Sequence, residues 1–130
     1  MAGELILIVE DNEKNRKLVR DVLQFKGYRT LDAETGEIGL QLAQETLPAL
    51  VLMDIQLPGM SGIDALGHLR ADPATRHIPV IAVTASAMMQ DRQKILAAGF
   101  DAYQSKPIDV KAFLQLVSDT LQAGPRSSAS

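Results

Sequence analysis

The sequence predicts a single α/β domain in which a five-stranded parallel sheet is covered by helices on both faces. The chain has 130 residues, the usual size of one domain. Apolar runs alternate five times with amphipathic segments, and the runs are unbroken, as in strands buried on both faces. Five strands in this length favour a doubly wound, flavodoxin-like (βα)5 domain with the strand order 2-1-3-4-5.

Each strand is expected where an apolar run is bounded by polar or turn-forming residues. The expected strands are Leu5–Val9, Tyr28–Leu31, Ala49–Asp54, Ile78–Val83 and Ala102–Ser105. In such a sheet the carboxyl ends of all strands lie at one edge, and ligands bind in the crevice outside that edge.

Capping residues, glycines and prolines set the expected helix ends. The helices are expected to begin after Asn12, at Thr35–Glu37, at the capping box Ser61–Asp64, near Ala87 and after Asp109. They should end at Gly27, before Pro48, at Asp72–Pro73, at Gly99 and before Gly124. Helical spacing predicts these inward faces: Leu18, Val22 and Phe25 beside Val19 and Leu23, then Ile38, Leu42 and Ala43, and finally Phe113, Leu114, Val117 and Leu121.

Polar side chains follow four of the expected strands at the point where each ends. Glu10 and Asp11 follow the first strand, Asp54 closes the third, Thr84 follows the fourth and Lys106 follows the fifth. A carboxylate at the end of a buried strand is costly unless it meets water, a cation or chemistry. Three acids, a hydroxyl and an amine around one crevice indicate a divalent cation and a phosphoryl group.

The composition excludes several classes of function. The net charge is -3, basic residues are not clustered and Trp is absent, so neither nucleic acid nor an anionic membrane is an expected partner. No apolar run is long enough to span a bilayer, and the start of the chain lacks a signal-peptide pattern. There is no Cys for a disulfide or a thiolate metal site. These features fit a small cytoplasmic protein.

Four motifs, in this order, resemble those of the receiver domains of bacterial two-component response regulators. They are Ile8–Asn12, Met53–Gly62, Pro79–Ala85 and Ser105–Pro107. Each motif alone is weak, but the four together are specific, and the resemblance covers the chain from about Leu5 to Leu121. The chain is also similar to the stand-alone members of the family, of the DivK type. We therefore expect a receiver domain at residues 1–122 and a flexible polar tail at 123–130.

The resemblance implies a phosphorylation site. Asp54 would accept a phosphoryl group from a phosphohistidine on a sensor histidine kinase or a histidine phosphotransfer protein. Asp11 and Asp54 would bind Mg²⁺ together with the backbone carbonyl of Gln56, and Glu10 would act mostly through a metal-bound water. No activity as an enzyme is expected beyond the chain's own phosphorylation and dephosphorylation.

The resemblance also implies a switch. Lys106, the hydroxyl of Thr84 and the backbone N–H of Ala85 would contact the phosphoryl oxygens, and Tyr103 would rotate into the space that Thr84 leaves. A cis bond between Lys106 and Pro107 is implied as well. The fourth helix, fifth strand and fifth helix would then act on a downstream protein that the sequence does not identify. We expect a monomer or a weak dimer.

The sequence leaves three alternatives to this interpretation. A haloacid-dehalogenase-type phosphatase also uses a strand-end Asp, but it needs a second acid two residues later, where this chain has Gln56. A flavodoxin-like binding module needs a phosphate-cradling loop after the first strand, where the acids of this chain would repel a phosphate. The third alternative is a receiver excised from a hybrid kinase. His68 and His77 have no metal-like neighbours in the sequence and are expected at the surface.

Overall fold

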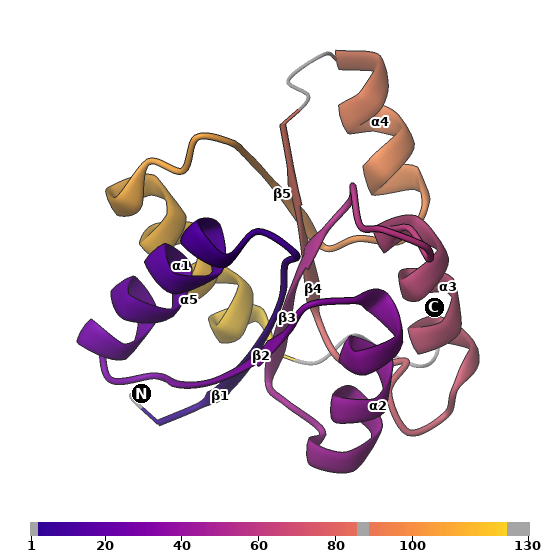
Figure 1. The fold of residues 1–130 in the computed structure, drawn as a ribbon, viewed down its shortest axis with the longest axis horizontal. Coiled ribbons are helices and arrows are strands. Elements are labelled where there is room, and N and C mark those ends of the chain that lie inside the picture. The colour runs from indigo at the N-terminus through magenta and orange to yellow at the C-terminus, as the bar shows by residue number, and fades with distance from the viewer. Residues whose placement is uncertain (1–2, 86–88, 125–130) are drawn as a thin grey trace.

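The computed structural model describes residues 3–85 and 89–124, and it has the predicted architecture (Figure 1). Strands and helices alternate along the chain. They are β1 (Leu5–Val9), α1 (Glu13–Phe25), β2 (Arg29–Ala33), α2 (Gly36–Thr46), β3 (Leu50–Asp54), α3 (Gly62–Ala71), β4 (Val80–Thr84), α4 (Met89–Ala97), β5 (Ala102–Ser105) and α5 (Val110–Ala123). All strand pairs are parallel, and the order β2-β1-β3-β4-β5 confirms the predicted sheet.

Two apolar layers hold the helices to the sheet. In Figure 1, α1 and α5 lie on one side of the sheet, while α2, α3 and α4 lie on the other. The first layer joins β1 and β3 to α1 and α5 and is centred on Phe113 and Val117. The second joins the opposite sheet face to α2, α3 and α4 and includes Leu66, Leu69 and Ile95. Burial of both sheet faces explains why the central strands are apolar without alternation.

Exposure differs between the central and the edge strands. All residues of β3 and β4 are buried, and β1 is buried from its second residue onward. The edge strand β2 carries the charged residues Arg29 and Asp32, and β5 has four residues that are all half-buried. The long apolar runs in the sequence therefore belong to the middle of the sheet.

The register brings the ends of the strands to one edge. Val9 lies opposite Met53, Asp54 opposite Val83, and Thr84 opposite Ser105. The backbone N–H of Lys106 then donates to the carbonyl of Thr84 at 2.8 Å. As a result, the residues that close or follow β1, β3, β4 and β5 share one edge, as expected.

Four helices begin at the predicted caps. The side chains of Asn12, Thr35, Ser61 and Asp109 each accept a hydrogen bond from a backbone N–H in the first turn. Such a bond satisfies one of the donors that a helix start leaves unpaired. The predicted start of the fourth helix at Ala87 lies outside the described residues. The tail is described only to Gly124, and Ala123 still belongs to α5.

The inward faces of α1 and α2 differ from the prediction. Phe25 is 87% exposed and Leu18 is also exposed, whereas Val19 and Leu23 are buried. Ile38 is exposed because α2 turns a face of small residues to the sheet. A Cβ on Gly39 of α2 would lie only 2.8 Å from Cγ2 of Val9. The helix therefore lies so close to β1 that a large side chain such as that of Ile38 would not fit between them.

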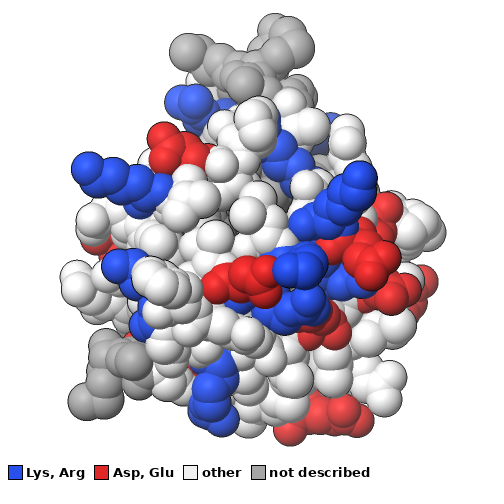
Figure 2. Space-filling model, turned by 60° about the vertical axis from the view of Figure 1, so that its left-hand side comes forward, with Lys and Arg blue, Asp and Glu red and all other residues white. Residues whose placement is uncertain are grey.

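Charged side chains of both signs are interleaved on the face shown in Figure 2. Among the described ion pairs, Lys17 with Asp21 lies within α1, and Arg20 with Asp32 joins α1 to β2. On that face the described residues form no broad basic area.

The start of α3 lies directly against the end of β3. The N–H of Gly62 donates to the carbonyl of Ile55 at 3.0 Å. A Cβ at Gly62 would lie 2.2 Å from the carbonyl oxygen of Asp54 and 2.8 Å from Cα of Ile55. Both are backbone atoms, so no side chain can move aside to make room. The glycine therefore sets how closely α3 approaches the segment after Asp54.

Gly62→Ala should lower the free energy of unfolding by about 1–3 kcal/mol, because the added methyl group overpacks a contact between backbones. Gly67→Ala on the same helix is the matched control. Its Cβ would meet nothing within 4 Å, and alanine is the better helix former, so it should be neutral or stabilising by about 0.5–1 kcal/mol. Urea denaturation of both variants checks this. Equal stability of the two variants would contradict the contact at Gly62.

Candidate functional site

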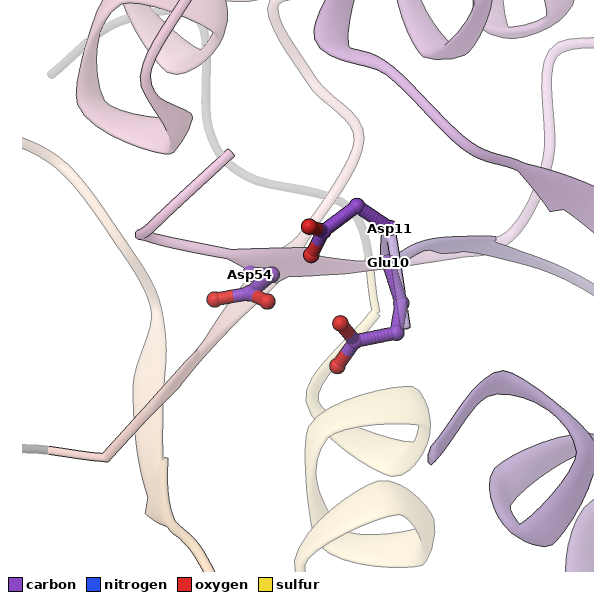
Figure 3. Close-up of side chains that lie close together, drawn as sticks. All are labelled: Glu10, Asp11 and Asp54. Atoms are coloured by element: carbon purple, nitrogen blue, oxygen red, sulfur yellow. The ribbon is translucent and has the colours of Figure 1, made fainter. Parts of the chain in front are cut away.

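Three carboxylates meet at the carboxyl edge of the sheet. Glu10, Asp11 and Asp54 each offer an oxygen, and these oxygens all lie within 4.8 Å of one another. Figure 3 shows the side chains turned toward a common space, Glu10 and Asp11 from the segment after β1 and Asp54 from the end of β3. Glu10 and Asp54 are buried, while Asp11 is exposed. The grouping of these acids was expected from the sequence.

Asp54 is the last residue of β3 and is 4% exposed. Its Oδ1 accepts a hydrogen bond from the backbone N–H of Gln56 at 3.0 Å, and its Oδ2 lies 3.1 Å from Nζ of Lys106. The first contact is a local turn that holds the carboxylate at the strand end. The second joins β3 to the residue after β5, on the far side of β4.

Glu10 is 5% exposed, and each of its polar groups has a partner. Oε1 lies 2.8 Å from Nζ of Lys106, and Oε2 accepts from the backbone N–H of Asn12 at 3.1 Å. The backbone N–H of Glu10 donates to Ala33 at 3.0 Å, and its carbonyl accepts from Nη1 of Arg16 at 3.0 Å. Glu10 is therefore fixed on all sides, which leaves it less available for direct metal binding than Asp11.

Asp11 differs from the other two acids. Its side chain is exposed, and within residues 3–85 and 89–124 it makes no hydrogen bond or ion pair. One of its oxygens still lies within 4.8 Å of an oxygen of each of the other two acids. A set of hard carboxylate oxygens open to water on one side fits Mg²⁺, which takes few protein ligands and keeps several waters.

Lys106 provides the positive charge of the cluster. Burial by itself lowers the pKa of its ammonium, but hydrogen bonds and charge interactions with Glu10 and Asp54 outweigh this effect, and the pKa is raised. Lys106 therefore stays protonated at neutral pH. The resulting stabilisation is fully present below the unfolded-state pKa of about 10.4 and is lost only as the pH rises through the raised folded-state pKa. The bond between Lys106 and Pro107 is cis, which confirms the expectation.

The remaining expected site residues lie along β4 and β5. Thr84 ends β4 and is buried, and Ala85 follows it at the surface. Tyr103 pairs with Ala82 in the sheet and is half-buried against the second apolar layer. Their roles toward a phosphoryl group stay predictions. Gln56 is exposed directly beyond the strand end of Asp54.

Two arginine contacts were missed by the sequence analysis. The Arg16 guanidinium reaches the Glu10 carbonyl, and Cζ of Arg92 on α4 lies 5.3 Å from the ring centroid of Tyr103. The only sequence signal for the first is an arginine one helical turn after the cap Asn12. Of the histidines, His68 is exposed and His77 is half-buried, and neither joins the acidic cluster.

No helix in the described part of the chain is long and apolar enough to cross a membrane.

Comparisons with known proteins agree with the site. Residues 6–118 match the family model of the response regulator receiver domain. The chain is 48% identical over 116 residues to the polar-differentiation response regulator DivK of Brucella ovis. The matched region covers 89% of this chain and 94% of that protein. The DivK of Brucella anthropi matches to the same extent. The relatives are bacterial two-component regulators.

Solved structures show the same fold. A putative response regulator from Chloroflexus aurantiacus has a TM-score of 0.88 and 28% identity, covering 92% of this chain and 98% of that one. The receiver domain of a sensor histidine kinase from Pseudomonas aeruginosa has a TM-score of 0.86 and 32% identity, covering 93% of this chain and 99% of that one. That structure was solved with a magnesium ion coordinated in its active site cleft. With its strand order, its cluster of acids and lysine and these matches, the chain belongs to the CheY-like receiver domains of two-component response regulators.

Proposed function

We propose that this chain accepts a phosphoryl group on Asp54 from a phosphohistidine of a sensor histidine kinase or a histidine phosphotransfer protein, and then controls a partner protein. The observation that carries the proposal is the position of the Asp54 carboxylate. It is buried at a strand end, 3.1 Å from the Lys106 ammonium and in reach of the two other acids. We further propose residues 1–122 as the receiver, although α5 continues one residue beyond this boundary, to Ala123.

In the proposed transfer an oxygen of Asp54 forms a bond to phosphorus, and the P–N bond to the donor imidazole breaks. The imidazole nitrogen keeps the electron pair and takes a proton from water. Such a transfer needs positioning and charge neutralisation more than covalent chemistry from the protein. Lys106 would move from its bond with Asp54 to a phosphoryl oxygen, which leaves its contact with Glu10 to hold it.

Asp11, Asp54 and the backbone carbonyl of Gln56 would hold a magnesium ion, with Glu10 acting through a bound water. When bound, the ion would neutralise charge on the phosphoryl oxygens. The exposed Asp11 and the fully engaged Glu10 support this division of roles.

The phosphoryl group would also be the signal of a switch. The hydroxyl of Thr84 and the N–H of Ala85 would bind its oxygens, and Tyr103 would move into the space that Thr84 leaves. A ligand shifts a two-state equilibrium only by its different contacts with the two states. The surface formed by α4, β5 and α5 would then change, and a partner protein would read that change.

The two rival functions lack support in the site. Gln56 is an exposed amide at the position where the phosphatase would need its second acid. The segment after β1 presents Glu10 and Asp11, which repel rather than cradle a bound phosphate. Receiver domains of this family are signalling proteins rather than metabolic enzymes.

The first prediction for this function concerns the acceptor. Incubation with acetyl phosphate and Mg²⁺ should raise the intact mass by one phosphoryl group, because the activated phosphorus meets the Asp54 carboxylate. Asp54→Asn should abolish the gain. Asp64→Asn, at an exposed acid on α3, is the control and should label fully. Full labelling of Asp54→Asn would rule out Asp54 as the sole acceptor.

The second prediction concerns the metal. Three acids face one ammonium, so Mg²⁺ should raise the free energy of unfolding, by about 1.4 kcal/mol at ten times its dissociation constant. Asp11→Ala should raise stability without metal, since it removes repulsion, and should weaken the response to Mg²⁺. Asp119→Asn on α5 is the control and should respond like the wild type. Thermal melts with and without Mg²⁺ measure this. A wild-type melt that ignores millimolar Mg²⁺ would count against a cation site.

The third prediction concerns the switch. Beryllofluoride, which mimics the phosphoryl group, should shift amide NMR signals of α4, β5 and α5 in the wild type. Thr84→Ala should bind it but respond weakly on that surface, and Lys106→Arg should do the same, because a planar guanidinium does not replace a compact ammonium. Thr46→Ala on α2 is the control. If the Thr84→Ala spectrum changes as fully as the wild type, Thr84 does not couple the site to that surface.

A further inference from the structure

Arg16 on α1 contacts the segment that carries Glu10 and Asp11, and only 12% of its side chain is exposed. Its Nη1 donates to the backbone carbonyl of Glu10 at 3.0 Å. On the other side, its Nε lies 3.8 Å from Oδ2 of Asp32, and its Nη2 lies 3.6 Å from Oε1 of Glu34. The guanidinium thus joins the end of β2 to the backbone of the acidic segment.

The bonded carbonyl belongs to the peptide group that links Glu10 to Asp11. Because a peptide group is planar, a bond that fixes this carbonyl also fixes the direction in which the chain enters Asp11. The position of Asp11 depends on that backbone, since its own side chain has no hydrogen bond or ion pair to any described residue. Glu10 and Asp54, by contrast, are held directly through their side chains.

Asp32 and Glu34 contact Nε and Nη2 of the guanidinium and so orient the Nη1 group that bonds to the Glu10 carbonyl. A guanidinium is a planar fork with several donors in fixed directions, so contacts on one edge aim the opposite edge. Arg20, one turn further along α1, also pairs with Asp32. Within the described residues its guanidinium donates to that acid alone. The two arginines therefore share an acidic partner, and only Arg16 reaches the segment with Asp11.

We propose that Arg16 is a positioning residue for the cation site: through the Glu10 carbonyl it holds Asp11 in place to bind Mg²⁺. This inference rests on the proposed function, because it assumes that Asp11 binds the ion. Partners behind metal ligands commonly set metal affinity by orienting those ligands.

The sign of the effect separates positioning from charge. Arg16 is a cation close to a proposed cation site, so its charge alone repels the ion, and its removal would tighten Mg²⁺ binding on Coulombic grounds. If Arg16 acts by holding the backbone, its removal must weaken binding in spite of the lost repulsion. The two accounts predict opposite changes in one measured constant.

The experiment compares Arg16→Met with Arg20→Met. Each variant loses one cation and one pairing with Asp32. Arg16→Met also loses the contact with Glu34 and the bond to the Glu10 carbonyl, and only that bond reaches the segment with Asp11. Mg²⁺ is titrated without any phosphodonor, and binding is followed by amide NMR shifts. We expect the dissociation constant to rise about tenfold in Arg16→Met and to stay within about twofold of wild type in Arg20→Met. Amide hydrogen exchange at Glu10, whose N–H donates to the carbonyl of Ala33, should also become faster only in Arg16→Met.

Arg16→Lys is the second variant, for the case that Arg16→Met does not fold. It keeps the charge but cannot span the carbonyl and both acids, so its Mg²⁺ binding should also be weakened. Unchanged or tighter binding in a folded Arg16 variant, with normal binding in the wild type, would overturn the inference and leave the proposed function intact. Absence of Mg²⁺ binding in the wild type would instead overturn the cation site itself.

Discussion

The Lys106 ammonium allows two carboxylates to be buried side by side at the end of the sheet. Taking Glu10 and Asp54 out of water is costly, and a cation in hydrogen-bond contact with both offsets part of that cost. The three residues are far apart in the sequence and meet only because β1, β3 and β5 run in the same direction. The arrangement of the strands and the charge balance of the site therefore depend on each other.

Backbone groups next to the strand ends also hold the carboxylates of the site. The local turn at Gln56 fixes one oxygen of Asp54, and the N–H of Asn12 fixes one oxygen of Glu10. Gly62 sets the approach of α3 to the segment after Asp54. A phosphoryl acceptor needs such support, because transfer depends on the position of the carboxylate more than on its intrinsic reactivity.

The sequence predicted the strands, the caps and the acidic cluster because each depends on local chemistry or on strand direction. An acid that closes an apolar run, such as Asp54, must lie at the end of a buried strand. The exposure of Phe25 and Ile38 was not predicted, since helical spacing gives the residues on a face but not which face meets the sheet. On α2, small residues such as Gly39 determine which face of the helix packs against the sheet. The contact of Arg16 depends on how β2 lies under α1, which no local pattern encodes.

The contrast between central and edge strands has a consequence for association between chains. A sheet edge exposes unpaired backbone groups to which a strand of another molecule can add. Here the apolar strands lie in the middle, while β2 carries Arg29 and Asp32 and β5 has only four residues. Charges and short length at an edge disfavour the addition of a further strand. The sheet is thus protected against growing into an aggregate, although its three central strands are apolar.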